Sequence, residues 1–416
     1  MKESLTLNGK SGPRALSFIT GLGMVVASIL TIRHFFMANY PTSIWEGSFC
    51  DISAFFNCNS SAFSVIAQIG GVPLGYFGLI VGGLVSLGAL FPSASFERTN
   101  KSIALLNFVG IIMLFFYSVL FLGSLCLLCS GYYVFGIFSF VLFWKYGIDK
   151  DKQGVMTRFF RPSLKHIVTY GVVTLLGAYG FILFHKAKKE AQAGGVAARV
   201  VKQYYNLPLV KSPSIISPFM SVKSTEKFED AAIHIIEYGD FLCPDCRYLN
   251  EQITRLKEEF KGKINIAFQF FPLDAQCNGV VDKDKHPGAC DLSYISAYDP
   301  EKFQQIHDEI FANFEAAKDP KWRAELAKKY QVQAALTDSK TQELVNRIIK
   351  TGAEYEKTSE KYAHGIRSTP TMILNNRMII GTLPYVQLRA IFQALVDEHE
   401  KAGKQKFLEN WVEPDS

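Results

Sequence analysis

The first part of the chain has few charged residues, and residues 37–64 contain no lysine or arginine at all. Long apolar runs fill most of the sequence before about residue 185, whereas the remainder has the charged composition of an ordinary globular protein. A content of 49% hydrophobic residues in a chain of 416 is high for a soluble protein. The composition therefore disfavours a purely soluble chain, and the length allows two or three domains.

No cysteine is left without a close neighbour in the sequence. Two of the pairs have C-x-x-C spacing, which lets a disulfide close, open again and pass electrons to another pair. Because the pairs form a series, the pattern favours an electron relay over a set of structural staples. The four pairs are Cys50/Cys58, Cys126/Cys129, Cys243/Cys246 and Cys277/Cys290.

Five apolar segments are long enough to cross the hydrocarbon core of a bilayer, which needs about 20 residues per helix. The third and fourth form one uncharged run, and residues 123–124 are the expected turn between them. No small-x-small cleavage site follows the first segment, so we expect it to stay as an anchor rather than be removed as a signal peptide. The segments are residues 15–32, 65–90, 103–122, 127–144 and 167–184.

The basic residues predict how these segments are oriented. They gather in the N-terminal tail, in the loop after the second segment, and in the loop over residues 145–165. The positive-inside rule places all three on the cytoplasmic side and explains the formal charge of +6 without a nucleic-acid partner. Arg33 and the lysines at 186–189 run against the rule, but the second group precedes a long domain, which is translocated largely regardless of charge. Five crossings then place all eight cysteines outside, where disulfides persist.

Residues from about 225 to 400 have the pattern of an α/β domain. A strand over 233–238 leads into Cys243-Pro-Asp-Cys246 and a helix over 247–260, and a second strand covers 264–271. Charged helical sequence follows over 300–364. Thr369-Pro370 then introduces strands over 371–374 and 378–381 with a turn between them, and a helix over 385–401 closes the domain. This order resembles a thioredoxin fold with a helical insertion, as in periplasmic thiol oxidoreductases.

The C-x-x-C motif at a helix start predicts distinct roles for its two thiols. A helix N-terminus stabilises a thiolate, so we expect Cys243 to attack and Cys246, one turn inside, to resolve the mixed disulfide. The resemblance implies a cis bond before Pro370, which faces the dithiol. Asp245 stands where strongly oxidising relatives carry histidine. A negative neighbour disfavours a thiolate, so the sequence predicts a weaker oxidant.

Glu237 lies six residues before the first cysteine of this motif, on an otherwise apolar strand. Thioredoxin-like proteins commonly place a buried acid there, which exchanges a proton with the resolving thiol, and burial raises the pKa of an acid. The alternative is a carboxylate on an edge strand that points into water. The sequence leaves both open.

Cys277 and Cys290 lie in a loop with several prolines and glycines. We expect a structural disulfide that staples this loop. A redox role is less favoured, because neither cysteine follows a strand or opens an obvious helix.

The apolar part carries a second resemblance. Its loop cysteines, a serine six residues further on, and a C-x-x-C followed by a tyrosine resemble the vitamin K epoxide reductase family, and the whole chain is similar to the bacterial members that carry a fused thioredoxin-like domain. The predicted fold class is an all-α membrane domain, a four-helix bundle plus a fifth transmembrane helix, followed by the α/β domain. The predicted domains are residues 1–147 for the bundle, 148–224 for the cytoplasmic loop, fifth helix and linker, and 225–416 for the thioredoxin-like domain. The residues that carry the resemblance are Cys50, Cys58, Ser64, Cys126, Cys129 and Tyr133.

The resemblance implies an enzyme of the bacterial cytoplasmic membrane, with a cytoplasmic N-terminus and a periplasmic or extracellular C-terminal domain. Electrons would pass from reduced secreted or periplasmic proteins to the soluble dithiol, to the loop pair, to the membrane pair, and to a quinone. By match, Cys129 reacts at the quinone and Cys126 exchanges with the loop pair. Ser64 and Tyr133 match polar positions near the quinone, their alternatives being a helix-start serine and an interfacial aromatic.

The residues support the quinone independently, since a quinone lives in the bilayer and its reductant must sit at membrane depth. Cys126-Leu-Leu-Cys129, in an apolar turn, meets that requirement. Animal members have an asparagine in the second span, and residues 65–90 contain none. This difference disfavours epoxide reduction and favours ubiquinone or menaquinone.

Three other interpretations stay open at this point. The fused domain could isomerise or reduce disulfides while the membrane half resets it. Two C-x-x-C pairs could hold zinc or copper, although no histidine lies near them and no metal is expected. The third is a non-catalytic scaffold with structural disulfides, which would resist mild reductant.

Overall fold

The computed structural model describes residues 10–41, 58–122, 124–148, 162–191, 195–210, 219–281, 284–355 and 365–402, together with Leu7, Ile44, Phe56, Phe159, Ile215 and Ile216. Cys50 and Gly123, which carry predictions above, lie outside these residues. The chain forms two compact units. The first comprises Met1–Asn39 and Phe56–Lys189, and the second comprises Tyr40–Phe55 and Glu190–Ser416.

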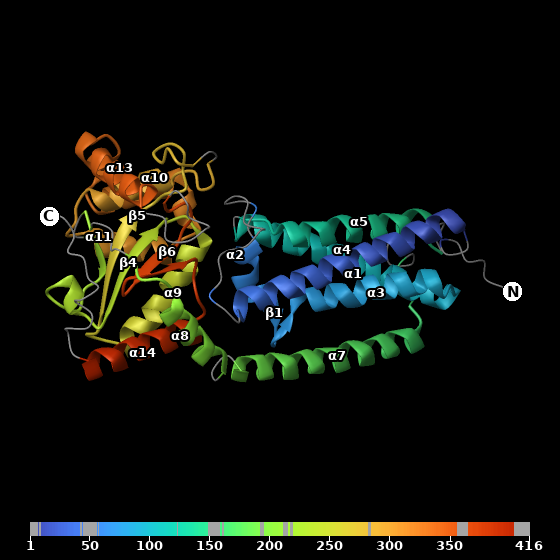
Figure 1. Cartoon of the computed structure of the whole chain (residues 1–416). Coiled ribbons are helices and arrows are strands. Elements are labelled where there is room, and N and C mark those ends of the chain that lie inside the picture. Colours follow the sequence, from blue (N-terminus) through green and yellow to red (C-terminus); the bar gives the residue numbers. More distant parts are fainter. Residues whose placement is uncertain are drawn as a thin grey trace. The chain divides into compact units, whose positions relative to one another are not determined.

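The first unit is built from apolar helices (Figure 1). Four of its described helices, α1, α4, α5 and α7, are long and apolar enough to cross a membrane, and α3 is a shorter apolar helix of 17 residues. A helix satisfies its backbone hydrogen bonds internally, which is what an apolar segment in a bilayer requires. The bounds are Ser11–Asn39 for α1, Cys58–Phe63 for α2, Leu74–Leu90 for α3, Ala94–Leu120 for α4, Leu127–Tyr146 for α5 and Leu164–Ala191 for α7.

Helices α1 and α3 pack closely because two glycines face each other. A Cβ atom on Gly21 would lie 2.9 Å from the carbonyl oxygen of Gly82, and one on Gly82 would lie 2.8 Å from the carbonyl oxygen of Gly21. Small residues allow such close approach between membrane helices. Helix α7 contacts α3 through Tyr76, whose hydroxyl donates to the carbonyl of Thr174 at 3.1 Å.

The prediction of one helix over residues 65–90 is wrong for its first nine residues. A 3-10 turn, Val65–Ala67, leads into a hairpin of β1 (Gln68–Ile69) and β2 (Val72–Pro73), and α3 follows. Gly70 and Gly71 have φ angles of 58° and 87°. A right-handed helix excludes these angles, and glycine adopts them without steric cost.

Helix α4 begins earlier than predicted, because the Ser93 hydroxyl caps it by accepting from the backbone N–H of Phe96. Lys101 is therefore in a helix rather than in a loop, and it is buried. Its ammonium donates to the carbonyl of Ile148. The carboxylate of Glu97, also buried, accepts from the backbone N–H of Ile148 at 2.8 Å. These contacts tie the start of α4 to the chain just after α5.

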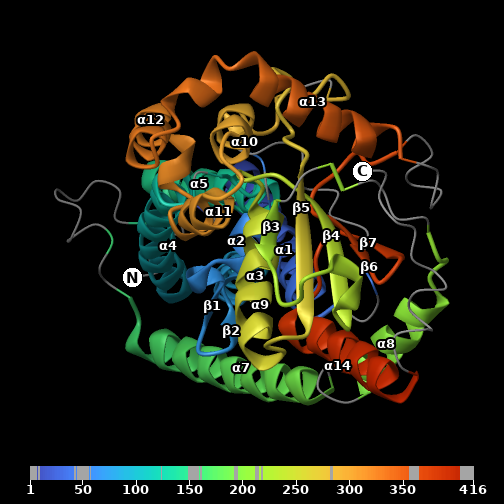
Figure 2. The same ribbon diagram turned by 90° about the vertical axis from the view of Figure 1, so that its left-hand side faces the viewer.

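The second unit contains a five-stranded sheet with the strand order β3-β5-β4-β6-β7 (Figure 2). Strands β4 and β5 pair in parallel, and α9 connects them in the chain. The other neighbouring strands in the sheet pair antiparallel. The β6–β7 hairpin turns at Asn375 and Asn376, whose φ angles are 42° and 61°, as this type of tight turn requires. The bounds are Met220–Val222 for β3, Ile233–Gly239 for β4, Ile264–Phe270 for β5, Thr371–Leu374 for β6 and Arg377–Ile380 for β7.

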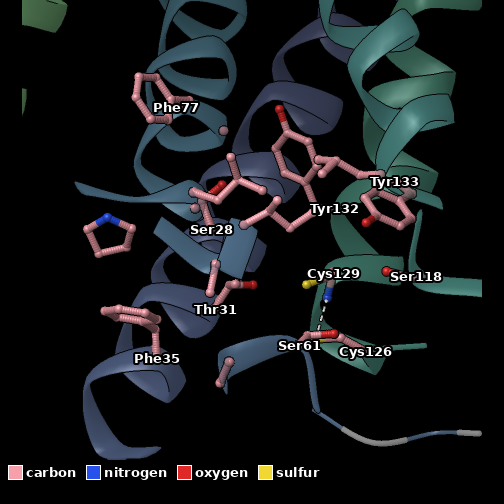
Figure 3. A pocket seen from close by; sticks show the side chains of 18 of the residues that line it. Ser28, Thr31, Phe35, Ser61, Phe77, Ser118, Cys126, Cys129, Tyr132 and Tyr133 are labelled. Carbon is pink, nitrogen blue, oxygen red and sulfur yellow. Dashed lines mark hydrogen bonds between the residues drawn. The ribbon is translucent and has the colours of Figure 1, made fainter. Parts of the chain in front are cut away.

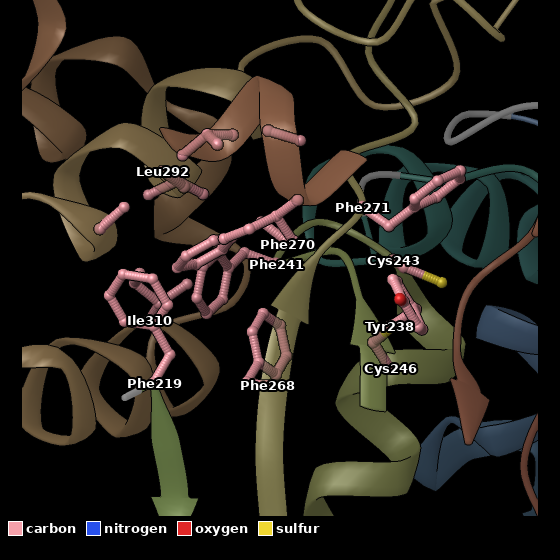
Figure 4. Close-up of a cluster of buried hydrophobic side chains, with 14 of the residues drawn as sticks. Phe219, Tyr238, Phe241, Cys243, Cys246, Phe268, Phe270, Phe271, Leu292 and Ile310 are labelled. Atoms are coloured by element: carbon pink, nitrogen blue, oxygen red, sulfur yellow. The ribbon is translucent and has the colours of Figure 1, made fainter. Parts of the chain in front are cut away.

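Helices cover both faces of this sheet. One face packs against α8, α9 and α14 through residues such as Ile235, Leu249 and Leu388. The other packs against the inserted helices through a phenylalanine-rich core that includes Phe241, Phe268 and Phe270 (Figure 4). The bounds are Ala197–Asn206 for α8, Pro244–Glu259 for α9, Ala289–Ala297 for α10, Phe303–Ala312 for α11, Pro320–Lys329 for α12, Ser339–Ala353 for α13 and Tyr385–Ala402 for α14.

The predicted fold class is confirmed, and the central strands and the closing helix lie where the sequence predicts them, within a residue or two. The insertion between β5 and β6 is helical, as expected. The sequence missed β3, so the sheet begins before the predicted domain start at 225, and α8 lies in the segment that was expected to be a helical linker. Helix α8 is joined to the sheet by Tyr204, whose buried hydroxyl donates to the carbonyl of Leu374 at 2.8 Å.

Candidate active site

The membrane C-x-x-C pair lies at the N-terminus of α5. Cys126 is the N-cap residue, and its sulfur accepts from the backbone N–H of Cys129 at 3.3 Å (Figure 3). Both cysteines are reduced in the structure, with Cys126 buried and Cys129 partly exposed. A helix N-terminus carries unsatisfied N–H groups and a partial positive charge, so this position suits a sulfur that ionises during exchange.

Cys58 brings a disulfide against this pair. It opens α2, is fully buried and is disulfide-bonded, while Cys50 lies outside the described residues. The Sγ atom of Cys126 lies 3.4 Å from the Sγ atom of Cys58. A β-bridge between Phe56 and Leu125 aligns the segments that precede the two cysteines. Exchange between the two sulfurs therefore needs little movement.

A cavity of about 340 Å³ opens beside these sulfurs, with a mostly apolar lining from α1, α3, α4, α5 and the segment over residues 58–67. Cofactor pockets commonly have this size and character, with a few polar groups that fix orientation. Here Tyr132 donates to the side-chain oxygen of Asn107 at 2.6 Å, and Thr31 lines the same cavity. Among the described residues, no group of three or more His, Cys, Asp or Glu side chains could hold a metal ion.

The two polar residues expected near a quinone both line this cavity. The hydroxyl of Ser64 donates to the carbonyl of Ser61 at 2.9 Å, so its proton already has a partner. Tyr133 lies one turn of α5 beyond Cys129, and Ser118 lies between the two (Figure 3). Asn107 and Tyr132 were not among the predicted residues, although a lone amide within an apolar run is a signal that the sequence offers.

The soluble dithiol occupies the N-terminus of α9. Cys243 is the N-cap residue and Pro244 takes the first helical position, which suits proline because no N–H is needed there. The Sγ atom of Cys243 lies 3.3 Å from the carbonyl oxygen of Thr369, and the Thr369–Pro370 bond is cis. Cys246 is fully buried, and both thiols are reduced (Figure 4).

Glu237 is buried on β4, which has β5 on one side and β6 on the other, so the edge-strand alternative is wrong. Burial raises the pKa of Glu237 to about 8. Burial also raises the pKa of Cys246 well above its usual value, and the nearby Cys243, Glu237 and Asp240 raise it further. An acid that is neutral at pH 7 thus interacts with the inner thiol.

Comparisons with known proteins match each part of the chain to a family. Residues 14–144 match the vitamin K epoxide reductase family, and residues 228–394 match the thioredoxin family. The chain joins a vitamin K epoxide reductase family domain to a thioredoxin-like domain. It is 36% identical over 88 residues to the probable disulfide bond formation protein D of Bacillus cereus, covering 20% of this chain and 38% of that protein. It is 24% identical over 170 residues to disulfide bond formation protein D of Bacillus subtilis, covering 39% of this chain and 71% of that protein.

Similar solved structures include the catalytic domain of Proteus mirabilis ScsC and a variant of Wolbachia pipientis alpha-DsbA1. The first has 14% identity and a TM-score of 0.30, and covers 40% of this chain and 85% of that chain. The second has 16% identity and a TM-score of 0.33, and covers 42% of this chain and 90% of that chain. For the Bacillus cereus relative, the match spans well under half of that protein's length.

In the thioredoxin-like domain, Cys277 and Cys290 form a disulfide with a Cα–Cα distance of 6.0 Å. The expectation that neither cysteine opens a helix is wrong for Cys290, which lies in the first turn of α10. The loop between them carries His286, whose Nδ1 lies 2.6 Å from a carboxylate oxygen of Asp240. The sequence prediction missed this pair, because 46 residues separate the two.

Proposed function

We propose that this chain is a membrane-bound thiol oxidase that introduces disulfides into secreted or periplasmic proteins and passes the electrons to a membrane quinone. The observation that carries the proposal is the 3.4 Å separation between the sulfurs of Cys126 and Cys58, beside a largely apolar cavity. Thiol–disulfide exchange requires a thiolate to reach a disulfide sulfur, and here the two groups are already in contact. The relatives named disulfide bond formation protein D support the same direction of electron flow.

Exchange at the membrane pair moves two electrons. The thiolate of Cys58 attacks Cys126 of a Cys126–Cys129 disulfide, forms the Cys58–Cys126 bond and releases the thiolate of Cys129. Cys50 then attacks Cys58, which closes the loop disulfide and releases Cys126. The loop pair has lost two electrons and two protons, and the membrane pair has gained them. A bound quinone supplies the acceptor for both electrons and both protons when the membrane pair is oxidised again.

The cavity has groups that fit a quinone. Its lining is mostly apolar, and it is large enough for a quinone ring. Because the side-chain oxygen of Asn107 accepts from Tyr132, the amide N–H groups of Asn107 remain as donors for a quinone oxygen. Cys129 and Tyr133 line the same cavity. We assign Cys129 to the quinone side and Cys126 to exchange with the loop pair.

The soluble dithiol is the proposed entry point for electrons. A client thiolate attacks Cys243 of a Cys243–Cys246 disulfide, and Cys246 leaves. Glu237 is protonated at neutral pH, because burial raises its pKa to about 8, and it gives its proton to the leaving thiolate. A second client thiol then resolves the mixed disulfide, and the reduced dithiol passes two electrons to Cys50/Cys58.

The start of the loop that carries Cys50 supports this last transfer. Ile44 donates its backbone N–H to the side-chain oxygen of Gln203 on α8 at 3.1 Å. Gln387 on α14 donates to the carbonyl of Pro41. The loop therefore begins in contact with helices of the thioredoxin-like domain. We propose a cytoplasmic N-terminus and five crossings, which place the loop and this domain on the same, external side.

Quinone reduction by the purified protein tests the proposal, with reduced unfolded protein as electron donor. We expect turnover by wild type, and none by Cys129→Ala or Cys243→Ala. Retained activity in Cys243→Ala would show that the fused domain is not the obligate entry point. Disulfide rearrangement in a scrambled client without net quinone reduction would instead favour the isomerase interpretation. If wild type reduces no quinone, the oxidase proposal fails.

A further inference from the structure

Asp240 organises the chain around the soluble dithiol. It follows β4 directly and is buried. Its two carboxylate oxygens accept from the backbone N–H of Leu242 and that of Leu273, each at 2.7 Å. Its own backbone N–H donates to the sulfur of Cys246 at 3.4 Å. The oxygen that binds Leu273 also contacts His286 Nδ1 at 2.6 Å. One buried carboxylate thus contacts both the imidazole and the backbone around the dithiol.

His286 is held in place by its own loop. The side chain is buried, and the backbone N–H donates to the carbonyl of Leu273 at 3.0 Å. The Cys277–Cys290 disulfide closes the loop. Asp274 fixes its far end by accepting from the backbone N–H of Gly288 at 2.8 Å. These restraints keep the imidazole at Asp240 without help from the C-x-x-C segment.

The charges that face His286 favour an imidazolium. Burial alone would lower the pKa of His286, but the Asp240 carboxylate raises it overall, with a further contribution from Cys243. Lys285 acts in the opposite direction and does not reverse the result. Asp240 joins His286 to the first cysteine: its carboxylate contacts the imidazole at 2.6 Å, and its backbone carbonyl accepts from the backbone N–H of Cys243 at 3.2 Å. A cation at His286 therefore lies close to the dithiol and favours a thiolate at Cys243.

We propose that His286, held by Asp240, is a positioning residue that stabilises the Cys243 thiolate as a cation, and that it takes the place of the histidine missing between the two cysteines. Stabilising the reduced form makes the disulfide a stronger oxidant. The domain should therefore oxidise clients better than its Cys-Pro-Asp-Cys sequence predicts. The inference rests on the proposed redox role of Cys243 and Cys246, but it does not depend on the quinone.

Substitution of His286 in the full chain tests this. For His286→Asn we expect the equilibrium constant with glutathione to move about tenfold toward the oxidised protein, a shift of about 30 mV. The pH profile of Cys243 alkylation by iodoacetamide should move to higher pH. The matched control is His234→Asn. Like His286, His234 is buried, but it lies on β4, where burial lowers its pKa to about 4, so it is neutral at pH 7. Unchanged values in a folded His286→Asn protein would overturn the proposal.

A second measurement needs no folded variant at position 286. In wild-type chain labelled with ¹³C-histidine, one imidazole should titrate at higher pH when the soluble dithiol is reduced than when it is oxidised, because the coupling is reciprocal. Substitution of the other histidines assigns that signal by elimination. Equal titration in both redox states would overturn the inference. If the shift is present but wild type reduces no quinone, the role of His286 stands and the oxidase proposal alone fails.

Discussion

The sulfur of Cys126 lies 3.4 Å from the sulfur of Cys58, although 68 residues separate them in the chain. The first sulfur caps α5 and the second opens α2, so two helix starts present their cysteines to each other. Cys58 is disulfide-bonded while Cys126 is reduced. A thiol thus lies beside a disulfide, and in our proposal this contact makes Cys126 the membrane cysteine that exchanges with the loop pair.

This contact predicts the product of an interrupted exchange. In Cys50→Ala, Cys58 can attack the membrane disulfide but cannot be resolved, so a Cys58–Cys126 disulfide should accumulate. Peptide mapping by mass spectrometry after alkylation identifies the bond. Cys50→Ala combined with Cys126→Ala is the control and should lack it. Accumulation of a Cys58–Cys129 bond would show that we have assigned the exchange to the wrong cysteine.

Glu237 predicts a pH dependence of client oxidation. With a pKa of about 8, Glu237 is protonated at pH 7 and can give a proton to Cys246 as it leaves. Glu237→Gln should slow single-turnover oxidation of a reduced peptide by about 10² at pH 7. In wild type the rate contribution of the acid should fall above pH 8, and the variant should lack this change. A variant with the wild-type rate and profile would exclude proton transfer by Glu237.

Substitution of Glu237 should raise the stability of the protein at high pH, although it slows client oxidation at pH 7. The folded-state pKa of Glu237 is raised from 4.5 to about 8, so ionisation of this carboxyl opposes folding. The cost is absent below pH 4.5, grows by about 1.4 kcal/mol per pH unit as pH rises, and levels off above pH 8. Glu237→Gln should therefore unfold at a higher temperature than wild type at pH 9, with a much smaller difference at pH 5. Calorimetry at the two pH values checks this.

Asn107 and Tyr132 predict an effect on quinone affinity. Asn107→Leu removes the amide donors from the cavity, and loss of one hydrogen bond should raise KM for the quinone about tenfold. The rate of exchange between Cys58 and Cys126 should stay unchanged, because the side-chain oxygen of Asn107 accepts from Tyr132, whereas the two sulfurs contact each other. The trapped disulfide in a Cys50→Ala background measures that rate. An unchanged KM would place the quinone oxygen elsewhere in the cavity.

The sheet of the thioredoxin-like domain was predictable because its signals are local. Strand β4 is short and mostly apolar, and the asparagines at 375 and 376 indicate the β6–β7 turn. Strand β3 has only three residues, Met220–Val222, and depends on β5 for its pairing, so no periodicity marks it. The β1–β2 hairpin before α3 was missed because its apolar residues continue those of the helix. Only Gly70 and Gly71 indicate a turn there.

The candidate site shows the same division. Both C-x-x-C pairs are visible in the sequence, because spacing and helix start are local features. The contacts of Cys58 with Cys126 and of Asp240 with His286 join residues 68 and 46 positions apart, and only the fold creates them. Asn107 is intermediate: its amide is conspicuous in an apolar run, but only packing shows that it lines the cavity with Cys129.

The Cys277–Cys290 disulfide predicts a stability effect that differs from that of the redox pairs. It closes a loop with a sequence separation of 13. Removing such a crosslink should lower the free energy of unfolding by about 3 kcal/mol. The double variant Cys277→Ser/Cys290→Ser should therefore melt at a lower temperature in calorimetry. Because the same loop fixes His286, the variant should also oxidise clients more weakly.

Cys243→Ser/Cys246→Ser is the control for this prediction. Both thiols are reduced in the structure, so no crosslink is lost and the melting temperature should change far less. Equal melting of both variants and wild type would show that the loop is held by Asp274 and its backbone contacts rather than by the disulfide.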